Sequence, residues 1–242
     1  TVFYCWRAFK QDDIKSWVLL GIFSALGILS KYLFIYLLLS LDIFFIYVII
    51  KKKLSFKSLI SLFVFCLLLL PHLVWLVNND YMTIQYGIFR SVDDPLSSFG
   101  NYMLLDNIVY PFIFLAKQIL IVLPFFVMFF FIISKFKFKL NHKDERLIFL
   151  LIITFAPIIL MFFTSLISGA RIRTMGMMPF YLFFAVTLIY IFKKQINLNK
   201  LKNLLSAFII IFFLSPTAYY ISSITKKNER TDYPGKEISK LI

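Results

Sequence analysis

Charge is scarce in this chain of 242 residues, and cysteine and histidine are scarcer still. Only 16% of the residues are charged, against about a quarter in soluble domains, whereas 61% are hydrophobic and 19% aromatic. This composition excludes a soluble globular domain and predicts a membrane protein. Cys5 and Cys66 stand in apolar surroundings without a CxxC pair or a nearby histidine, so we expect buried thiols, no disulfide, no metal site and no cofactor.

Acidic residues are few as well: 12 Asp and Glu stand against 26 Lys and Arg, which gives a formal net charge of +14. A strongly basic chain can indicate nucleic acid binding. Here the basic residues cluster in linkers between apolar runs, which is the pattern of the positive-inside rule for membrane proteins. The excess of positive charge therefore predicts membrane topology and no nucleic acid partner.

Apolar runs of about 20 residues predict the spans of an all-α, polytopic transmembrane helix bundle. The run from Trp17 to Ile50 is too long for one helix across a hydrocarbon core of about 30 Å, so we divide it at Lys31. About seven spans result: Trp17 to Ser30, Tyr32 to Ile50, Leu59 to Val77, Phe114 to Ser134, Leu147 to Ile167, Met178 to Phe192 and Leu204 to Ile224.

The positive-inside rule orients these spans, because every basic linker then falls on one side of the membrane. We assign that side to the cytoplasm; its linkers are residues 10–15, 51–57, 135–146 and 193–202. The opposite face, the periplasm of a bacterial inner membrane, receives the Lys31 turn and a long loop over residues 78–111. We expect short amphipathic helices at the membrane interface within this loop.

The ends of the chain suggest a segment of a longer protein. It begins without methionine in what looks like a helix already under way, and it stops soon after a polar stretch begins. We expect residues 1–224 to form the transmembrane region and residues 225–242 to begin a C-terminal periplasmic segment.

Three basic residues on the predicted outer face call for explanation. A lysine within an apolar run is costly unless it snorkels, pairs or faces water, so Lys31 is either a snorkelling helix end or a ligand for an anion. Arg171 and Arg173 occupy a short turn on the side that positive residues avoid. A guanidinium suits bidentate contact with a phosphate, although binding of lipid headgroups is the alternative.

Four stretches, in this order, resemble one family. WVLLGIFSALGILSKY (17–32) resembles the W-x-x-x-G-x-x-x-x-x-G-x-x-x-K-Y/G stretch of the GT-C fold glycosyltransferases that use polyprenyl-phosphate sugars, a group that includes protein O-mannosyltransferases and lipid A aminoarabinose transferases. PHLVWLVNNDYMTIQYG (71–87) resembles their P-x-x-x-W-N-x-x-N/D segment. ARIRTMGMMPFYLF (170–183) resembles their basic turn, and TDYPGKEIS (231–239) the entry to their C-terminal periplasmic domain.

The chain departs from the family pattern at three places. Leu76 follows Trp75 where the family has Asn, and Met177 and Met178 stand where an aromatic residue is usual. The catalytic aspartate of the family lies in a loop that would precede Thr1. We therefore assign no catalytic residue within the chain and expect residues 1–242 alone to lack transferase activity.

The resemblance implies a membrane glycosyltransferase of cell-envelope biogenesis. It would move a hexosyl or pentosyl group from a polyprenyl-phosphate donor to a periplasmic lipid, glycan or protein. Charge grows on the leaving phosphate in such a transfer, and the resemblance gives Lys31, Arg171 and Arg173 the role of binding it. A transporter or flippase for a lipid-linked substrate is the alternative, as is an O-antigen ligase or polymerase.

For other polar residues the sequence gives weaker indications of a functional role. Asn79, Asp80 and Tyr86 follow a predicted span; they cap a helix end or bind the sugar or acceptor. His72 is interpreted as a hydrogen-bonded interior histidine, and Tyr32 as part of the aromatic belt. The remaining polar residues of interest are Asp42, which either pairs within the bundle or lines a polar cavity, His142, interpreted as solvated, and Arg90, Asp93 and Asp94, interpreted as loop salt bridges.

Overall fold

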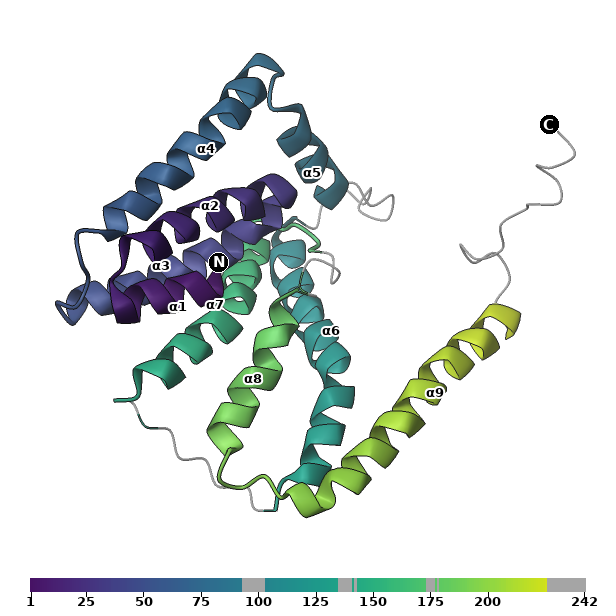
Figure 1. The fold of residues 1–242 in the computed structure, drawn as a ribbon. Helices are drawn as coiled ribbons and strands as arrows, with labels where there is room; N and C mark the ends of the chain where they lie inside the picture. The colour runs from purple at the N-terminus through teal and green to yellow at the C-terminus, as the bar shows by residue number, and fades with distance from the viewer. Residues whose placement is uncertain (93–102, 135–140, 142, 173–176, 178, 226–242) are drawn as a thin grey trace, which may run out of the picture. The chain divides into compact units, whose positions relative to one another are not determined.

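The computed structural model describes residues 1–92, 103–134, 141, 143–172, 177 and 179–225. Apart from one isolated β-bridge, the regular structure of these residues is helical, as the composition predicts (Figure 1). The helices are α1 (Val2–Gln11), α2 (Ile14–Ser30), η1 (Tyr32–Phe34), α3 (Ile35–Ile50), α4 (Ser58–Asn78), α5 (Met82–Val92), α6 (Met103–Ile132), α7 (Glu145–Ser168), α8 (Tyr181–Phe192), η4 (Leu198–Lys200) and α9 (Leu201–Thr225).

Each predicted span corresponds to one helix. Five helical segments are long and apolar enough to cross a membrane: Tyr32–Ile50, Ser58–Asn78, Asn107–Ile132, Glu145–Ser168 and Leu198–Thr225. The first and sixth predicted spans correspond to the shorter apolar helices α2 and α8. The division of the first apolar run is confirmed, because α2 ends at Ser30 and a new helical segment begins at Tyr32.

The fourth predicted span begins too late. Helix α6 begins at Met103, inside the predicted outer loop, and continues through Pro111, which the sequence suggested as a span end or kink. A membrane-type helix tolerates an internal proline because neighbouring groups can satisfy the freed carbonyl. The same loop contains α5, so a short helix occurs where one was expected.

The chain divides into two compact units. Unit 1 comprises residues 1–120 and 138–191, and unit 2 comprises residues 121–137 and 192–242. Within unit 2, an antiparallel bridge between Ile133 and Ile196 joins the end of α6 to the segment before α9. The backbone N–H of Asn197 donates to the carbonyl of Ile132 at 3.0 Å beside it.

Helix α3 forms the centre of unit 1. Its Leu41 and Phe44 belong to a buried cluster with residues of α1, α2 and α7, including Trp17 and Ile153. Its Leu37 belongs to a second cluster formed with α6, α7 and the segment before α8. The structure thus gathers elements from residues 2 to 183 around one helix.

Helix α4 packs against α2 and leaves much of its surface open. At the contact, a Cβ added to Gly21 would lie 2.5 Å from the carbonyl oxygen of Ser61 and 2.9 Å from Cβ of Val64. The missing side chain therefore allows close approach of the two backbones, as small residues do in membrane helix pairs. Since the outer faces of α4 are open, Cys66 is exposed; the prediction of a buried thiol holds for Cys5 and is wrong for Cys66.

Ionic contacts gather three of the four basic linkers at one end of unit 1. Glu145 pairs with Lys53 and, at 2.5 Å, with Lys10. Asp12 pairs with Lys57 at 3.0 Å and accepts a hydrogen bond from the indole of Trp17 at 3.0 Å. The topology prediction requires these linkers to lie on the same side, and their contacts agree with it.

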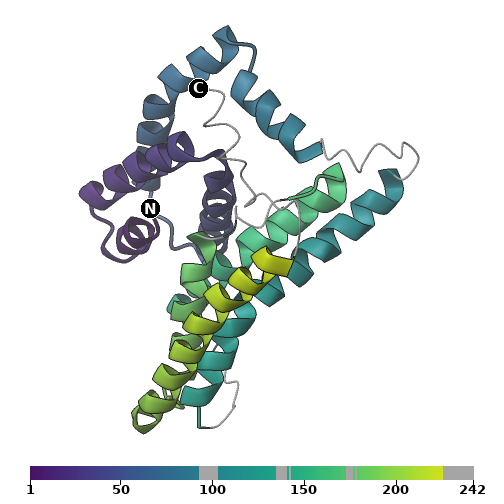
Figure 2. The same ribbon diagram turned by 90° about the vertical axis from the view of Figure 1, so that its right-hand side faces the viewer.

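Helices α4 and α5 meet at a sharp bend, which Figures 1 and 2 show from two directions. Asp80 and Tyr81 adopt positive φ angles of 50° and 54°, an uncommon conformation for residues with side chains. The amide of Asn79 donates to the carbonyl of Trp75 at 2.8 Å and caps the end of α4. The bend turns the chain back, so that α5 lies near the Lys31 turn.

Candidate functional site

A recess of about 510 Å³ lies beside the Lys31 turn in unit 1. Among the described residues that line it, Lys31 is the only one with a charged side chain, and most of the others are apolar. The lining residues are Thr1, Val2, Phe3, Gly27, Ser30, Lys31, Leu33, Phe34, Leu37, Pro179, Phe180 and Phe183. An apolar recess with a single cation suits a ligand that joins a hydrocarbon chain to an anionic group.

The Lys31 turn is held by short-range contacts. Lys31 has an extended backbone, with φ −159° and ψ 121°, between the last residue of α2 and the first of η1. Its N–H donates to the carbonyl of Gly27 at 3.0 Å, and its carbonyl accepts from the N–H of Phe34 at 2.9 Å. A Cβ on Gly27 would collide with the ring of Phe34, so glycine is needed for the chain to fold back this closely. The side chain of Lys31 remains exposed.

The segment that follows the basic turn reaches the same recess. Met177 is fully buried in the cluster that contains Leu37 of α3, and Pro179 and Phe180 line the recess together with Lys31. Two stretches that lie far apart in the sequence, residues 27–37 and the described residues 177 and 179–183, therefore meet in space. A common site for Lys31 and the basic turn requires such a meeting.

The basic turn itself is described only in part. Helix α7 ends at Gly169, whose φ of 65° favours glycine, and Arg171 follows with an exposed side chain. Several residues that the sequence singled out lie outside the described residues: Arg173, His142, Asp93, Asp94 and residues 226–242. The side chain of Arg90 lies outside them too.

The polar residues after α4 differ in their contacts. Asn79 caps the helix through its amide, as described above, and Asp80 stands in the bend with an exposed side chain. The carbonyl of Asp80 accepts a hydrogen bond from Gln85 at 2.8 Å. Tyr86 is exposed on α5. Helix capping thus accounts for Asn79, and a sugar or acceptor contact by these residues stays a prediction.

Sequence reasoning missed the role of Tyr32. Its hydroxyl lies 2.9 Å from Nε2 of His72 on α4 and 2.9 Å from Oγ1 of Thr83 on α5. The interpretation of His72 as a hydrogen-bonded histidine is confirmed, although the ring is only half-buried. No pattern along the chain marks this trio, because Tyr32 is 40 residues from His72 and 51 from Thr83.

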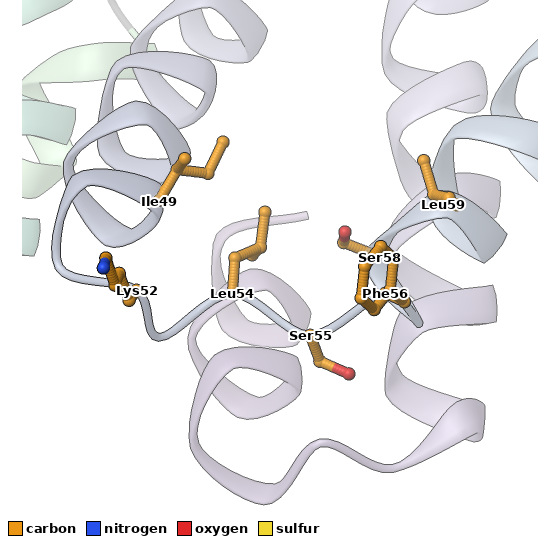
Figure 3. Close-up of a pocket in the computed structure, with 7 residues that line it drawn as sticks. All are labelled: Ile49, Lys52, Leu54, Ser55, Phe56, Ser58 and Leu59. Atoms are coloured by element: carbon orange, nitrogen blue, oxygen red, sulfur yellow. The ribbon is translucent and has the colours of Figure 1, made fainter.

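A second recess, of about 420 Å³, lies between the end of α3 and the start of α4 (Figure 3). Ile49, Leu54 and Leu59 line it with Lys52, and Phe56 beside them is 90% exposed. This recess belongs to the basic linker over residues 51–57, which the topology prediction places in the cytoplasm. The recess at Lys31 is therefore the candidate on the opposite face.

Comparison with known families bears on the segment that contains the Lys31 turn. Residues 1–75 match the family described as dolichyl-phosphate-mannose-protein mannosyltransferase. The resemblance drawn from residues 17–32 is thus confirmed over residues 1–75, and the five long apolar helices of the described residues agree with a multi-pass membrane protein.

The mannosyltransferase match includes the Lys31 turn, His72 and Trp75, and it ends before the α4–α5 bend and the basic turn. The roles suggested for residues 78–87, 170–183 and 231–239 thus stay predictions. No curated protein and no solved structure matches the chain.

Proposed function

We propose that this protein transfers a sugar from a polyprenyl-phosphate donor to a lipid, glycan or protein acceptor on the periplasmic face of a bacterial inner membrane. The observation that carries the proposal is the recess beside Lys31, most of whose lining residues lie in the segment that matches the mannosyltransferase family. Its apolar walls suit the isoprenoid chain, and its single lining cation suits the phosphate. Residues 1–224 would form the membrane region and residues 225–242 the start of a periplasmic segment.

The reaction explains why a cation is needed. An acceptor oxygen attacks the anomeric carbon, the bond from that carbon to the donor phosphate breaks, and the acceptor proton passes to a carboxylate base. Negative charge grows on the leaving phosphate, so a fixed ammonium stabilises the transition state more than the ground state. At 4 Å and an effective dielectric constant of about 20, this attraction is about 4 kcal/mol before the cost of desolvation.

Arg171 and Arg173 would share this phosphate with Lys31. The support is the meeting of residues 177–183 with the Lys31 turn, because those residues continue the basic turn directly. Asn79, Asp80 and Tyr86, on and beside the α4–α5 bend, are the proposed contacts for the sugar or acceptor. The recess opens at one end of α2 and not at the middle of a span, which favours an enzyme over a transporter or flippase.

The test is the variant Lys31→Met in the full-length protein. We expect kcat for release of polyprenyl phosphate from a polyprenyl-phosphate-linked sugar to fall about tenfold or more, and Lys31→Arg to retain part of the activity, because charge matters more than geometry here.

Lys52→Met is the matched control, since this exposed lysine lies at the other end of α3. It should leave kcat unchanged. Full activity of Lys31→Met would remove Lys31 from the site, and substrate translocation without formation of a new glycosidic bond would favour the transporter.

A further inference from the structure

The Tyr32 hydroxyl joins three elements at the end of the Lys31 turn. A phenol has one proton to donate and lone pairs to accept, so it can bond to His72 and Thr83 at the same time. The ring of His72 lies 5.9 Å from that of Trp75 at an interplanar angle of 11°, and this stacking fixes the imidazole plane. A belt tyrosine directs its hydroxyl to lipid headgroups, whereas Tyr32 directs it to protein groups.

The packing of α2 on α4 sets this arrangement. Gly21 faces Ser61 and Tyr32 faces His72, so the same 40-residue offset relates the two segments at both contacts. Helices that run in the same direction keep such an offset because each rises 1.5 Å per residue. Tyr32 of η1 thus keeps, beyond the break at Lys31, the offset that Gly21 of α2 shows.

Tyr32 directly follows the lysine that lines the recess. The backbone of Lys31 is already bonded to Gly27 and Phe34, and the Tyr32 hydroxyl adds an anchor to α4 and α5. A lysine side chain is long and flexible, so the position of its ammonium depends on how firmly its backbone is held. If the Lys31 turn were held less firmly, the ammonium would still be charged, but it would be positioned less accurately.

We propose that Tyr32, held by His72 and Thr83, is a positioning residue that sets where the Lys31 ammonium meets an anionic lipid phosphate. The proposal rests on the proposed function of Lys31. It assigns a role to His72 and Thr83, which contact the tyrosine hydroxyl, and it links the two motifs at residues 17–32 and 71–87.

The experiment is a double-mutant cycle on binding of undecaprenyl phosphate to the full-length protein in lipid nanodiscs. Lys31→Met should weaken binding about tenfold, and Tyr32→Phe, which removes only the hydroxyl, about three- to tenfold. The double variant should bind no more weakly than Lys31→Met, because Tyr32 acts through the lysine. Additive losses would overturn the positioning role.

The two proposals fail in different ways. If Lys31→Met weakens binding and Tyr32→Phe does not, the positioning role is wrong and the phosphate site stands. If Lys31→Met binds as tightly as the parent, both are wrong.

Substitutions of His72 and Thr83, the hydrogen-bond partners of Tyr32, separate a positioning role from a general effect on stability. His72→Leu and Thr83→Val should reproduce the loss of Tyr32→Phe, whereas His72→Gln and Thr83→Ser, which keep a hydrogen-bonding group near the same place, should restore binding to within about twofold. Tyr36→Phe, one turn further along, is the matched control and should change nothing. Loss of binding in His72→Gln equal to that in His72→Leu would count against the hydrogen bond.

Discussion

Asp12 is the residue that connects the first linker to the next. Hydrogen bonds from Trp17 and then from Lys57 hold the pKa of its carboxyl below the ordinary value. Its ionised form therefore stabilises the folded chain. That contribution is complete above the ordinary aspartate pKa of about 4 and is lost as the pH falls through the lowered pKa.

We predict that Asp12→Asn lowers the thermal unfolding temperature of the detergent-solubilised protein at neutral pH. The difference from the parent should shrink as the pH is lowered below about 4, because protonation then removes the same charge from the parent. Lys57→Gln, which removes the paired ammonium, should follow the same pH course. A difference that stayed constant across this range would show that ionisation of Asp12 does not stabilise the fold.

At the scale of elements, the contact between α2 and α4 depends on a missing side chain. In Gly21→Ala the new methyl group would overlap the Ser61 carbonyl and Val64, so the helices must separate. We predict a loss of about 1–3 kcal/mol in the free energy of unfolding, as for other overpacked contacts. The measurement is reversible unfolding in mixed micelles.

Gly87 provides the matched control for that substitution. A Cβ at Gly87 would meet no atom within 4 Å, and the residue lies in the interior of α5. Gly87→Ala should be neutral or stabilise the protein by roughly 0.5–1 kcal/mol, since alanine favours a helix over glycine. Equal losses for the two variants would indicate that space at the α2–α4 contact is not the cause.

Individual helices were predictable because hydropathy is a property of neighbouring residues. The apolar runs located the helices that correspond to all seven predicted spans, and Ser30-Lys31-Tyr32 marked the break in the first run. The start of α6 was not predictable, because Asp106, Asn107 and Pro111 interrupt the apolar pattern at its beginning. Whether these residues form a helix depends on the tertiary contacts that they make.

At the scale of the whole molecule, the contacts of Glu145 and Asp12 gather three basic linkers at one end of unit 1. The proposed orientation puts that end in the cytoplasm and the α4–α5 bend outside. The accessibility of introduced cysteines in cells tests this orientation directly, since Ser55 and Met82 lie beyond opposite ends of α4.

In protein lacking Cys5 and Cys66, we predict that Met82→Cys reacts with an impermeant thiol reagent in intact cells. Ser55→Cys should react only after the membrane is permeabilised, which also controls for its accessibility. Met82 is 61% exposed. The reverse pattern would invert the topology and remove the periplasmic assignment of the Lys31 recess.

Composition and local pattern indicated a membrane environment, located the helices and marked Lys31 as a charge that needs a partner, because burial of apolar runs and the cost of a charge in lipid depend on the residues themselves. Only the tertiary structure decided what surrounds that lysine. The recess, the approach of residues 177–183 and the bonds of Tyr32 join segments 40 or more residues apart. Such contacts depend on how the helices pack, and a close approach like that at Gly21 is visible only once both backbones are in place.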